Sequence, residues 1–417
     1  MKIAMLTNNY RPFVGGVPIS VERQARELIK RGHEVTVFAP AYGDTVEDQE
    51  RMKEEDEKGE EKVIRFQTRK KKMENGMVCP TFCPKEIVEQ FKRQEFDYIH
   101  VHHPMFVGTC GIYLKKKYGI PLIYTYHTRY EDYLHYIPGL KIDEHSSQLK
   151  KHVLTVAKEK IVPTYMKWFA DQCDLVLAPS NGMKQMLEAQ GATTRVEIFP
   201  TGLDSEFYEQ VQIRARKIRE HYAGNKKHLF VTVSRLEKEK NYDFLLNGIA
   251  RLKELLGVDF QVLIIGDGSQ GNELKKKASA LDIEDVITFI GNVPNRKIKE
   301  YLQSADLFLF SSKSETQGIV LVEAMAAGLP VIALHATGVD DIVIDGVNGY
   351  LTEEKEELWA KKIAVACTPK IRKCLQISAW ETAEKYRAET LALKEEMLYN
   401  QCSIDLQEKQ MQYLIIH

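Results

Sequence analysis

Short apolar runs alternate with amphipathic segments along most of this chain. Ile3–Leu6 and Glu34–Ala39 are rich in apolar residues, as strands buried in a parallel sheet are. Between them, Pro18–Lys30 carries apolar residues at helical spacing, and Gly32 follows as a stop signal. The chain therefore opens with a strand, a helix and a strand, which predicts an α/β fold with parallel strands.

The same alternation continues on both sides of residue 205. We expect further strands at 63–66, 97–102, 121–126, 174–178 and 196–199, and then at 229–233, 260–265, 286–290, 307–310 and 331–334. The turn-rich segment Pro200–Tyr208 is interpreted as a linker. The pattern predicts two facing Rossmann-like, doubly wound domains at 1–203 and 204–385. Residues 386–417 form a helix and tail that we expect to cross back to the first domain.

Composition narrows the class of protein without changing the fold prediction. Of the 417 residues, 44% are hydrophobic and 28% charged, and the net charge is -1, so nothing global favours nucleic acid. The N-terminus lacks the apolar core of a signal peptide, and no apolar run reaches about 18 residues. We therefore expect a cytoplasmic protein. The seven cysteines are scattered, which favours free thiols over a metal site.

The segment from Lys313 to Val331 concentrates the candidate chemistry. A helix that is apolar except for Glu323 is predicted to end at Gly328. Glu315 lies in the preceding loop, and the first amides of the helix, at Gly318, Ile319 and Val320, are donors that favour anions. Two carboxylates around such amides suit a ligand with hydroxyls and a phosphate. The alternative is structural, because a buried Glu also caps loops or pairs with Arg.

Other candidates follow predicted strands, where ligands bind in open α/β sheets. Gly15 and Gly16 follow the first strand, His127 follows 121–126, and Arg235 and Lys240 follow 229–233. Glycines let a backbone approach a ligand closely, and the two cations would neutralise phosphate. Each candidate has a structural alternative. The two glycines could form a simple tight turn, the histidine could be a structural hydrogen-bonding residue, and the two cations could form surface ion pairs with Glu237 and Glu239.

A basic cluster at Arg69–Lys72 precedes the apolar residues Met73, Met77, Val78 and Phe82. Basic residues beside apolar ones dock on anionic lipid, each charge adding about 1 kcal/mol. The alternative is a solvated charged run. Residues 43–62 are also strongly charged and are expected to form a solvated loop.

Taken together, these motifs resemble those of retaining glycosyltransferases of family 4, which have the GT-B fold. The resemblance is carried by NNYRPFVGGV, YTYHT, PTGLD, SRLEKEKN, GDG, FIGNV and SETQGIVLVEAMAAGLPVIA, and it extends from residue 2 to about residue 350. It implies transfer of a hexose from a nucleotide-sugar, usually a UDP-sugar, with the anomeric configuration kept. It also implies that the first domain binds the acceptor and the second the donor.

The resemblance assigns charged residues of the second domain to the donor. Arg235 and Lys240 would hold the diphosphate, Glu323 would bind the ribose and Glu315 the hexose. Two fixed cations and a helix N-terminus would stabilise the leaving group, so we expect no metal and no other cofactor.

It also assigns roles to backbone groups and to the first domain. The amides of Gly318, Ile319 and Val320 would meet phosphate and sugar, and Gly291 to Val293 would line the base pocket. Gly15 and Gly16 would approach the diphosphate from the first domain, and His127 would lie beside the sugar.

Within that family, ETQG, HHPMFVGTCG and YTYHTRYEDYLHY are similar to diacylglycerol α-glucosyltransferases. This implies glucose transfer from UDP-glucose to diacylglycerol by a protein that is peripheral on the inner membrane surface, and the Arg69–Lys72 cluster fits such docking. One alternative is a soluble acceptor, such as a sugar, thiol precursor or polyol phosphate. Another is a non-catalytic binding protein, against which the intact set Arg235, Lys240, Glu315 and Glu323 argues.

Overall fold

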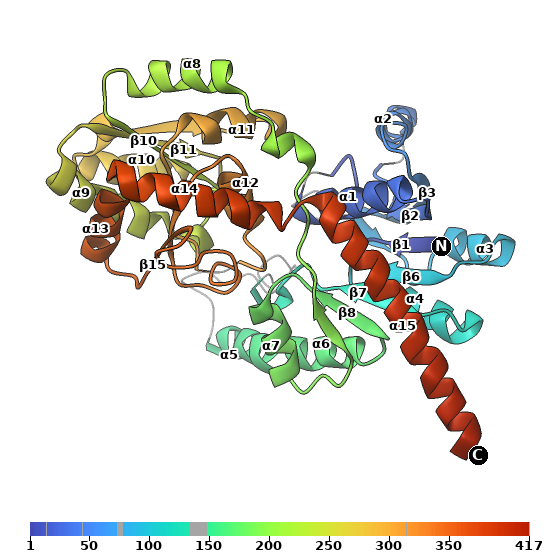
Figure 1. The fold of residues 1–417 in the computed structure, drawn as a ribbon. Helices are drawn as coiled ribbons and strands as arrows, with labels where there is room; N and C mark the ends of the chain where they lie inside the picture. Colours follow the sequence, from blue (N-terminus) through green and yellow to red (C-terminus); the bar gives the residue numbers. More distant parts are fainter. Residues whose placement is uncertain (14, 44, 73–77, 133–147, 314, 417) are drawn as a thin grey trace. The chain divides into compact units, whose positions relative to one another are not determined.

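The computed structural model describes residues 1–13, 15–43, 45–72, 78–132, 148–313 and 315–416. Within these ranges, the side chains of 69–72, 79, 80, 132, 149, 409, 410 and 413–416 are not described. The chain divides into two compact units (Figure 1). Unit 1 comprises Met1–Gly202 and Ala388–His417, and unit 2 comprises Leu203–Arg387. The sequence places these boundaries at 203/204 and 385/386.

Unit 1 is built on a seven-stranded sheet in which every neighbouring pair is parallel. Apolar residues of each strand point alternately to the two faces, so Leu6 and Met5 belong to separate apolar clusters. In sheet order, the strands are β3 (Lys62–Phe66), β2 (Glu34–Pro40), β1 (Lys2–Leu6), β6 (Tyr98–Val101), β7 (Leu122–Thr125), β8 (Leu175–Ala178) and β9 (Val196–Ile198).

Helices complete unit 1, and the last helix of the chain is one of them. Helix α15 packs against α1 (Figure 1). Its Leu398 and Tyr399 are buried in the same cluster as Met5 of β1. The helices are α1 (Gly16–Lys30), α2 (Val46–Asp56), α3 (Lys85–Arg93), α4 (Val107–Tyr118), α5 (Gln148–Val156), α6 (Val162–Ala170), α7 (Asn181–Ala189) and α15 (Ala388–Ile416).

Unit 2 repeats this plan with a six-stranded parallel sheet. Phe230 and Trp359 belong to the apolar cluster on one face, and Phe308 and Met325 to the cluster on the other. In sheet order, the strands are β12 (Ile287–Gly291), β11 (Phe260–Ile265), β10 (His228–Val233), β13 (Leu307–Phe310), β14 (Val331–Leu334) and β15 (Gly349–Thr352). The helices are α8 (Gln212–Ala223), α9 (Tyr242–Leu256), α10 (Gly271–Ala280), α11 (Asn295–Ser304), α12 (Ile319–Ala326), α13 (Glu356–Ala366) and α14 (Pro369–Glu384).

Each sheet reverses its strand order once, and the reversal marks where ligands bind. In unit 1 the chain runs outward from β1 and returns to β6 on its other side. In unit 2 it runs outward from β10 and returns to β13. Ligands of open α/β sheets bind outside the carboxyl ends of the strands at such switch points. The loops after β1, β6, β10 and β13 are therefore where each unit is expected to bind ligands.

Local structure differs from the sequence-based expectation at three places in the main chain. Residues 43–62 are expected from the sequence to form a solvated loop, but they contain helix α2. Its one buried residue, Met52, packs against Tyr42 and so attaches the helix to the rest of unit 1. The basic run is part of an antiparallel hairpin of β4 (Thr68–Lys72) and β5 (Val78–Pro80). Strand β15 (Gly349–Thr352) is a further strand, beyond the last one expected at 331–334.

The cysteines differ as well. Cys83 and Cys110 form a disulfide with a Cα–Cα distance of 4.6 Å, which corrects the expectation of free thiols at these two positions. The fold brings together the loop before α3 and the first turn of α4, and sequence spacing gives no sign of that approach. Cys173, Cys367, Cys374 and Cys402 are free.

Candidate active site

Lys240 and Glu315 form the centre of the candidate site in unit 2. Lys240 follows β10, Glu315 follows β13, and these two strands are neighbours at the switch point. The ammonium nitrogen of Lys240 lies 2.6 Å from Glu315 Oε1, and each side chain is 15% exposed. Ser311 Oγ also donates a hydrogen bond of 2.8 Å to the carbonyl of Lys240. The structure thus joins two of the sequence-predicted residues, and Lys240 pairs with Glu315 rather than with its near neighbours in sequence.

Arg235 forms a surface ion pair with Glu239, as in the structural alternative considered from the sequence. Its guanidinium lies 3.0 Å from Glu239 and is about half exposed. Glu237 instead accepts hydrogen bonds from the amide and hydroxyl of Ser269. An exposed ion pair contributes little to stability, on the order of 0–1 kcal/mol. The ion pair with Glu239 is therefore a weak one.

Two glycines hold the loop after β10 against the loop after β11. A Cβ on Gly266 would lie 1.9 Å from the carbonyl oxygen of Ser234, and one on Gly268 would lie 2.5 Å from that of Leu236. The amide of Leu236 in turn donates to the Asp267 carbonyl at 3.0 Å. The SRLEKEKN and GDG motifs therefore pack tightly against each other, and this close backbone approach requires the two glycines of GDG.

Helix α12 has the termini that the sequence predicts. Gly318, at φ 79°, precedes the helix, and Gly328, at φ 80°, follows it, both in the left-handed region that favours glycine. Glu323 is buried in the middle of the helix, at 9% exposure. The first amides of a helix lack partners within it, so those of Ile319 and Val320 make this end suited to anions.

The loop that carries Glu315 packs against a glycine that the sequence analysis did not identify. Gly338 has φ 76°, and a Cβ there would lie 2.9 Å from the Glu315 carbonyl oxygen and 3.1 Å from Gln317 N. Only a contact between distant segments reveals the need for glycine here, so local sequence carries no signal for it.

Gly291 and Val293, the candidates for the base pocket, lie at the end of β12. Gly291 has φ 79°, and its carbonyl accepts a hydrogen bond of 2.9 Å from Gly266 N. Val293 packs against the apolar cluster that includes α12. Both residues therefore lie at the same end of the sheet as the loops after β10 and β11.

In unit 1, His127 lies at the carboxyl end of β7 beside two histidines that follow β6. Its Nε2 lies 3.0 Å from His102 Nδ1, and the two rings are stacked. The amide of Asn8, after β1, donates to His103 Nδ1 at 3.1 Å. Burial lowers the pKa of His127 to about 3 and that of His102 well below its usual value, so both rings are neutral at pH 7. Sequence analysis identified His127 but not its partner.

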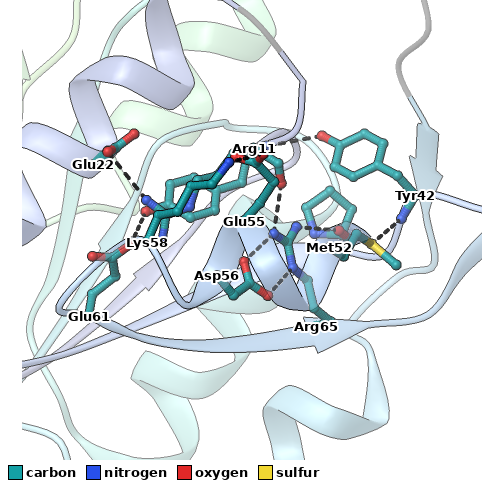
Figure 2. Close-up of polar contacts among 11 residues, drawn as sticks. Arg11, Glu22, Tyr42, Met52, Glu55, Asp56, Lys58, Glu61 and Arg65 are labelled. Carbon is teal, nitrogen blue, oxygen red and sulfur yellow. Dashed lines mark hydrogen bonds and ion pairs between the residues drawn. The ribbon is translucent and has the colours of Figure 1, made fainter. Parts of the chain in front are cut away.

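Gly15 and Gly16 close the loop after β1, and a polar network holds the start of that loop. Arg65 of β3 donates to the carbonyls of Arg11 and Pro40 at 2.7 and 2.9 Å, and it pairs with Asp56 at the end of α2 (Figure 2). Arg11 also pairs with the buried Glu61. Sequence analysis missed this network, because several of its charges lie in the stretch interpreted as a solvated loop.

The candidate membrane-binding cluster lies largely outside the described part of the chain. The side chains of the Arg69–Lys72 cluster, and residues Met73 and Met77, lie outside the described part of the chain. Of the helices that are described, none has both the length and the apolar character needed to cross a membrane. The described residues contain no group of three or more His, Cys, Asp or Glu side chains placed to hold a metal ion.

Comparison with protein families places both units in known groups. Residues 14–207 match the family described as Glycosyltransferase Family 4. Residues 214–374 match the family described as Glycosyl transferases group 1. The second match falls within unit 2, and nearly all of the first falls within unit 1.

Individual proteins resemble the chain over most of its length. Alpha-monoglucosyldiacylglycerol synthase from Acholeplasma laidlawii is 28% identical over 406 residues, which are 96% of each chain. The protein of the same name from Streptococcus pneumoniae is 29% identical over 376 residues, or 86% of this chain and 76% of the relative. Among solved structures, Anabaena HepE in complex with UDP and glucose matches 96% of this chain and 100% of its own, with a TM-score of 0.70 and 21% identity.

Proposed function

Because this chain belongs to the family 4 glycosyltransferases with the GT-B fold, we propose that it uses a nucleotide-sugar donor and transfers glucose from UDP-glucose to diacylglycerol with retention of configuration. The observation that carries this proposal is the similarity to two proteins named alpha-monoglucosyldiacylglycerol synthase, over 86% and 96% of the chain. The UDP and glucose bound in HepE, a protein of the same fold, favour UDP-glucose as the donor to test first.

In the proposed donor complex, Arg235 and Lys240 of unit 2 change their ion-pair partners. Arg235 and Lys240 now neutralise Glu239 and Glu315, and a diphosphate would replace both carboxylates. Glu315 would then accept hydrogen bonds from the hexose hydroxyls, and the buried Glu323 would accept from the ribose. Arg235 is suited to the diphosphate because a guanidinium can donate two parallel hydrogen bonds to it.

The same groups would stabilise the transition state. As the bond between the anomeric carbon and the diphosphate breaks, its electron pair moves to the phosphate oxygen and the sugar becomes oxocarbenium-like. Two cations and the first amides of α12 would oppose that growing negative charge from positions fixed before the reaction. The diacylglycerol hydroxyl would attack from the face that the diphosphate leaves and would give its proton to the departing phosphate oxygen. We propose no covalent sugar–enzyme intermediate.

Unit 1 has an exposed apolar surface that suits a lipid acceptor. Met105 and Phe106, before α4, are 38% and 37% exposed, and Trp168 of α6 is 46% exposed. Tyr165 connects Trp168 with the segment before α4, since its ring centroid lies 5.6 Å from that of Trp168 and its hydroxyl donates a hydrogen bond to the Pro104 carbonyl. Exposed aromatic side chains of this kind suit the headgroup region of a bilayer. We propose peripheral binding to the inner membrane surface on this basis.

Donor and acceptor can be tested in one assay. The protein is given UDP-, GDP- or ADP-glucose with vesicles of anionic phospholipid that either contain or lack diacylglycerol. We expect a lipid-soluble glucose product from UDP-glucose only when diacylglycerol is present, and we expect the protein to sediment with the vesicles. Turnover with a soluble acceptor such as a polyol phosphate, without sedimentation, would replace the lipid acceptor with a soluble one.

A further inference from the structure

We propose that His102 is a positioning residue that fixes the ring and tautomer of His127, so that His127 meets its ligand as a hydrogen-bond donor through Nδ1. This inference rests on the proposed function only in taking that ligand to be a sugar hydroxyl. Both rings belong to unit 1, so their arrangement does not depend on the donor site of unit 2.

The contact between the two rings is short and enclosed. His102 is fully buried, and its Nδ1 lies 3.0 Å from Nε2 of the partly exposed His127. The rings are stacked, with centroids 5.3 Å apart. The ring of His100 also packs against that of His102, with centroids 4.2 Å apart. A close-packed side chain of this kind has little freedom to turn away from His127.

The proton in this contact can be placed by considering the other nitrogen of His102. That atom, Nε2, is buried and has no hydrogen-bond partner among the described residues. A buried N–H without an acceptor is rarer than a buried acceptor with an unused lone pair. His102 therefore carries its proton on Nδ1 and donates it to His127 Nε2. A neutral His127 then carries its own proton on Nδ1.

This tautomer determines what His127 can bind. Its Nε2 is occupied by His102, so the ring presents one N–H and no lone pair to a ligand. An uncharged donor suits the oxygen of a sugar hydroxyl and cannot remove its proton. His127 would thus orient a hydroxyl, and His102 would act through His127 without touching the substrate.

The tautomer can be measured directly on the free protein. With ¹⁵N-labelled histidine, His127 is assigned by the signals that disappear in H127Q. We expect a protonated Nδ1 and a bare Nε2. In H102L the donor is lost, so the His127 signals should shift toward a mixture of tautomers. In H102N the amide nitrogen takes the place of Nδ1, so the wild-type pattern should be kept.

Activity gives the second readout. We expect H102L to lower kcat about 10-fold, which corresponds to one lost hydrogen bond, while H102N stays close to wild type and UDP affinity is unchanged in both. If H102L does not fold, H102Q is used in its place. The glutamine amide lies one methylene beyond the position of Nδ1, so this variant also lacks the hydrogen bond to His127.

Two outcomes separate this proposal from the proposed function. The role of His102 would be overturned if H102N and H102L (or H102Q in its place) had equal activities and equal His127 spectra. If H127Q retains full activity while the tautomer of His127 shifts in H102L as expected, the role of His127 at the sugar fails and the positioning by His102 stands.

Discussion

In unit 2 the ammonium of Lys240 lies 2.6 Å from Glu315, and both side chains are largely enclosed. A cation in such a place is held at a fixed point at the carboxyl end of the sheet before any ligand arrives. Preorganised charge of this kind contributes most to a transition state in which negative charge develops. Lys240 is therefore suited to a leaving diphosphate that takes the place of Glu315, and it is the most informative residue of the pair to change.

Replacing Lys240 with Ala should lower turnover of the nucleotide-sugar by about 100-fold or more, because a fixed cation at the diphosphate is lost. The matched control is Lys238→Ala, which removes an exposed lysine from the same short turn. Steady-state kinetics on both variants, with thermal unfolding to check the fold, make the comparison. Unchanged turnover in Lys240→Ala would remove the proposed phosphate role.

A second prediction at this scale concerns Gly338, whose φ of 76° and crowded Cβ position both exclude a side chain. Gly338→Ala should displace the loop that carries Glu315 and impair turnover. The control is Gly346→Ala, which has nearly the same φ, 74°, but open space around its Cβ. Both changes should destabilise the fold by about 1–2 kcal/mol from backbone strain, seen in denaturant unfolding. Equal activity of the two variants would show that contact with the Glu315 loop is unimportant.

Among the elements, α15 carries the clearest consequence for stability. Its Glu395 is buried at 1% exposure and accepts a hydrogen bond of 3.0 Å from Tyr399 OH, which also contacts His100 Nδ1 at 2.7 Å. Arg23, Gln24 and Glu27 of α1 line the same small cavity. Burial raises the pKa of Glu395 to about 8, so the folded protein holds a proton there that the unfolded chain loses near its usual pKa of 4.5.

From about pH 6.5, where the buried histidines are neutral in the folded and the unfolded chain alike, stability should therefore fall as pH rises to about 8. In that window the folded state binds one more proton than the unfolded state, so this residue contributes a slope of about -1.4 kcal/mol per pH unit. Glu395→Gln mimics the protonated acid and should flatten the slope. The control is the neighbouring Glu396→Gln: pairing with Arg31 lowers the pKa of Glu396, so its titration lies at more acidic pH. Denaturant unfolding at several pH values measures both, and parallel slopes for wild type and Glu395→Gln would contradict the account.

The elements that sequence could predict are those with strong apolar signals. Buried runs such as Ile3–Leu6 and Leu307–Phe310 lie in the two sheets, and the glycines at both ends of α12 have the expected conformation. Helix α2 escaped prediction because Met52 is its one buried residue. His102 and Gly338 could not be identified, because their roles depend on contacts between segments that are distant in sequence.

At the scale of the whole molecule, the two family matches and the two parallel sheets describe one class of enzyme, the glycosyltransferases. We predict that transfer proceeds unchanged in EDTA, because in the proposed mechanism Arg235 and Lys240 would supply the positive charge that opposes the leaving diphosphate. Initial rates are measured with EDTA and then after addition of Mn²⁺ or Mg²⁺. Activity that collapses in EDTA and returns only with Mn²⁺ would require a metal in the mechanism.

The most direct measurement is the anomeric configuration of the sugar in the product. UDP-glucose is α-configured, so a retaining enzyme should give α-glucosyl diacylglycerol, identified by NMR of lipid extracted from vesicles after reaction. We predict this product from the wild-type protein and its loss in Lys240→Ala. A β-linked product, or no glucosylated lipid at all from protein that binds UDP-glucose, would contradict the account.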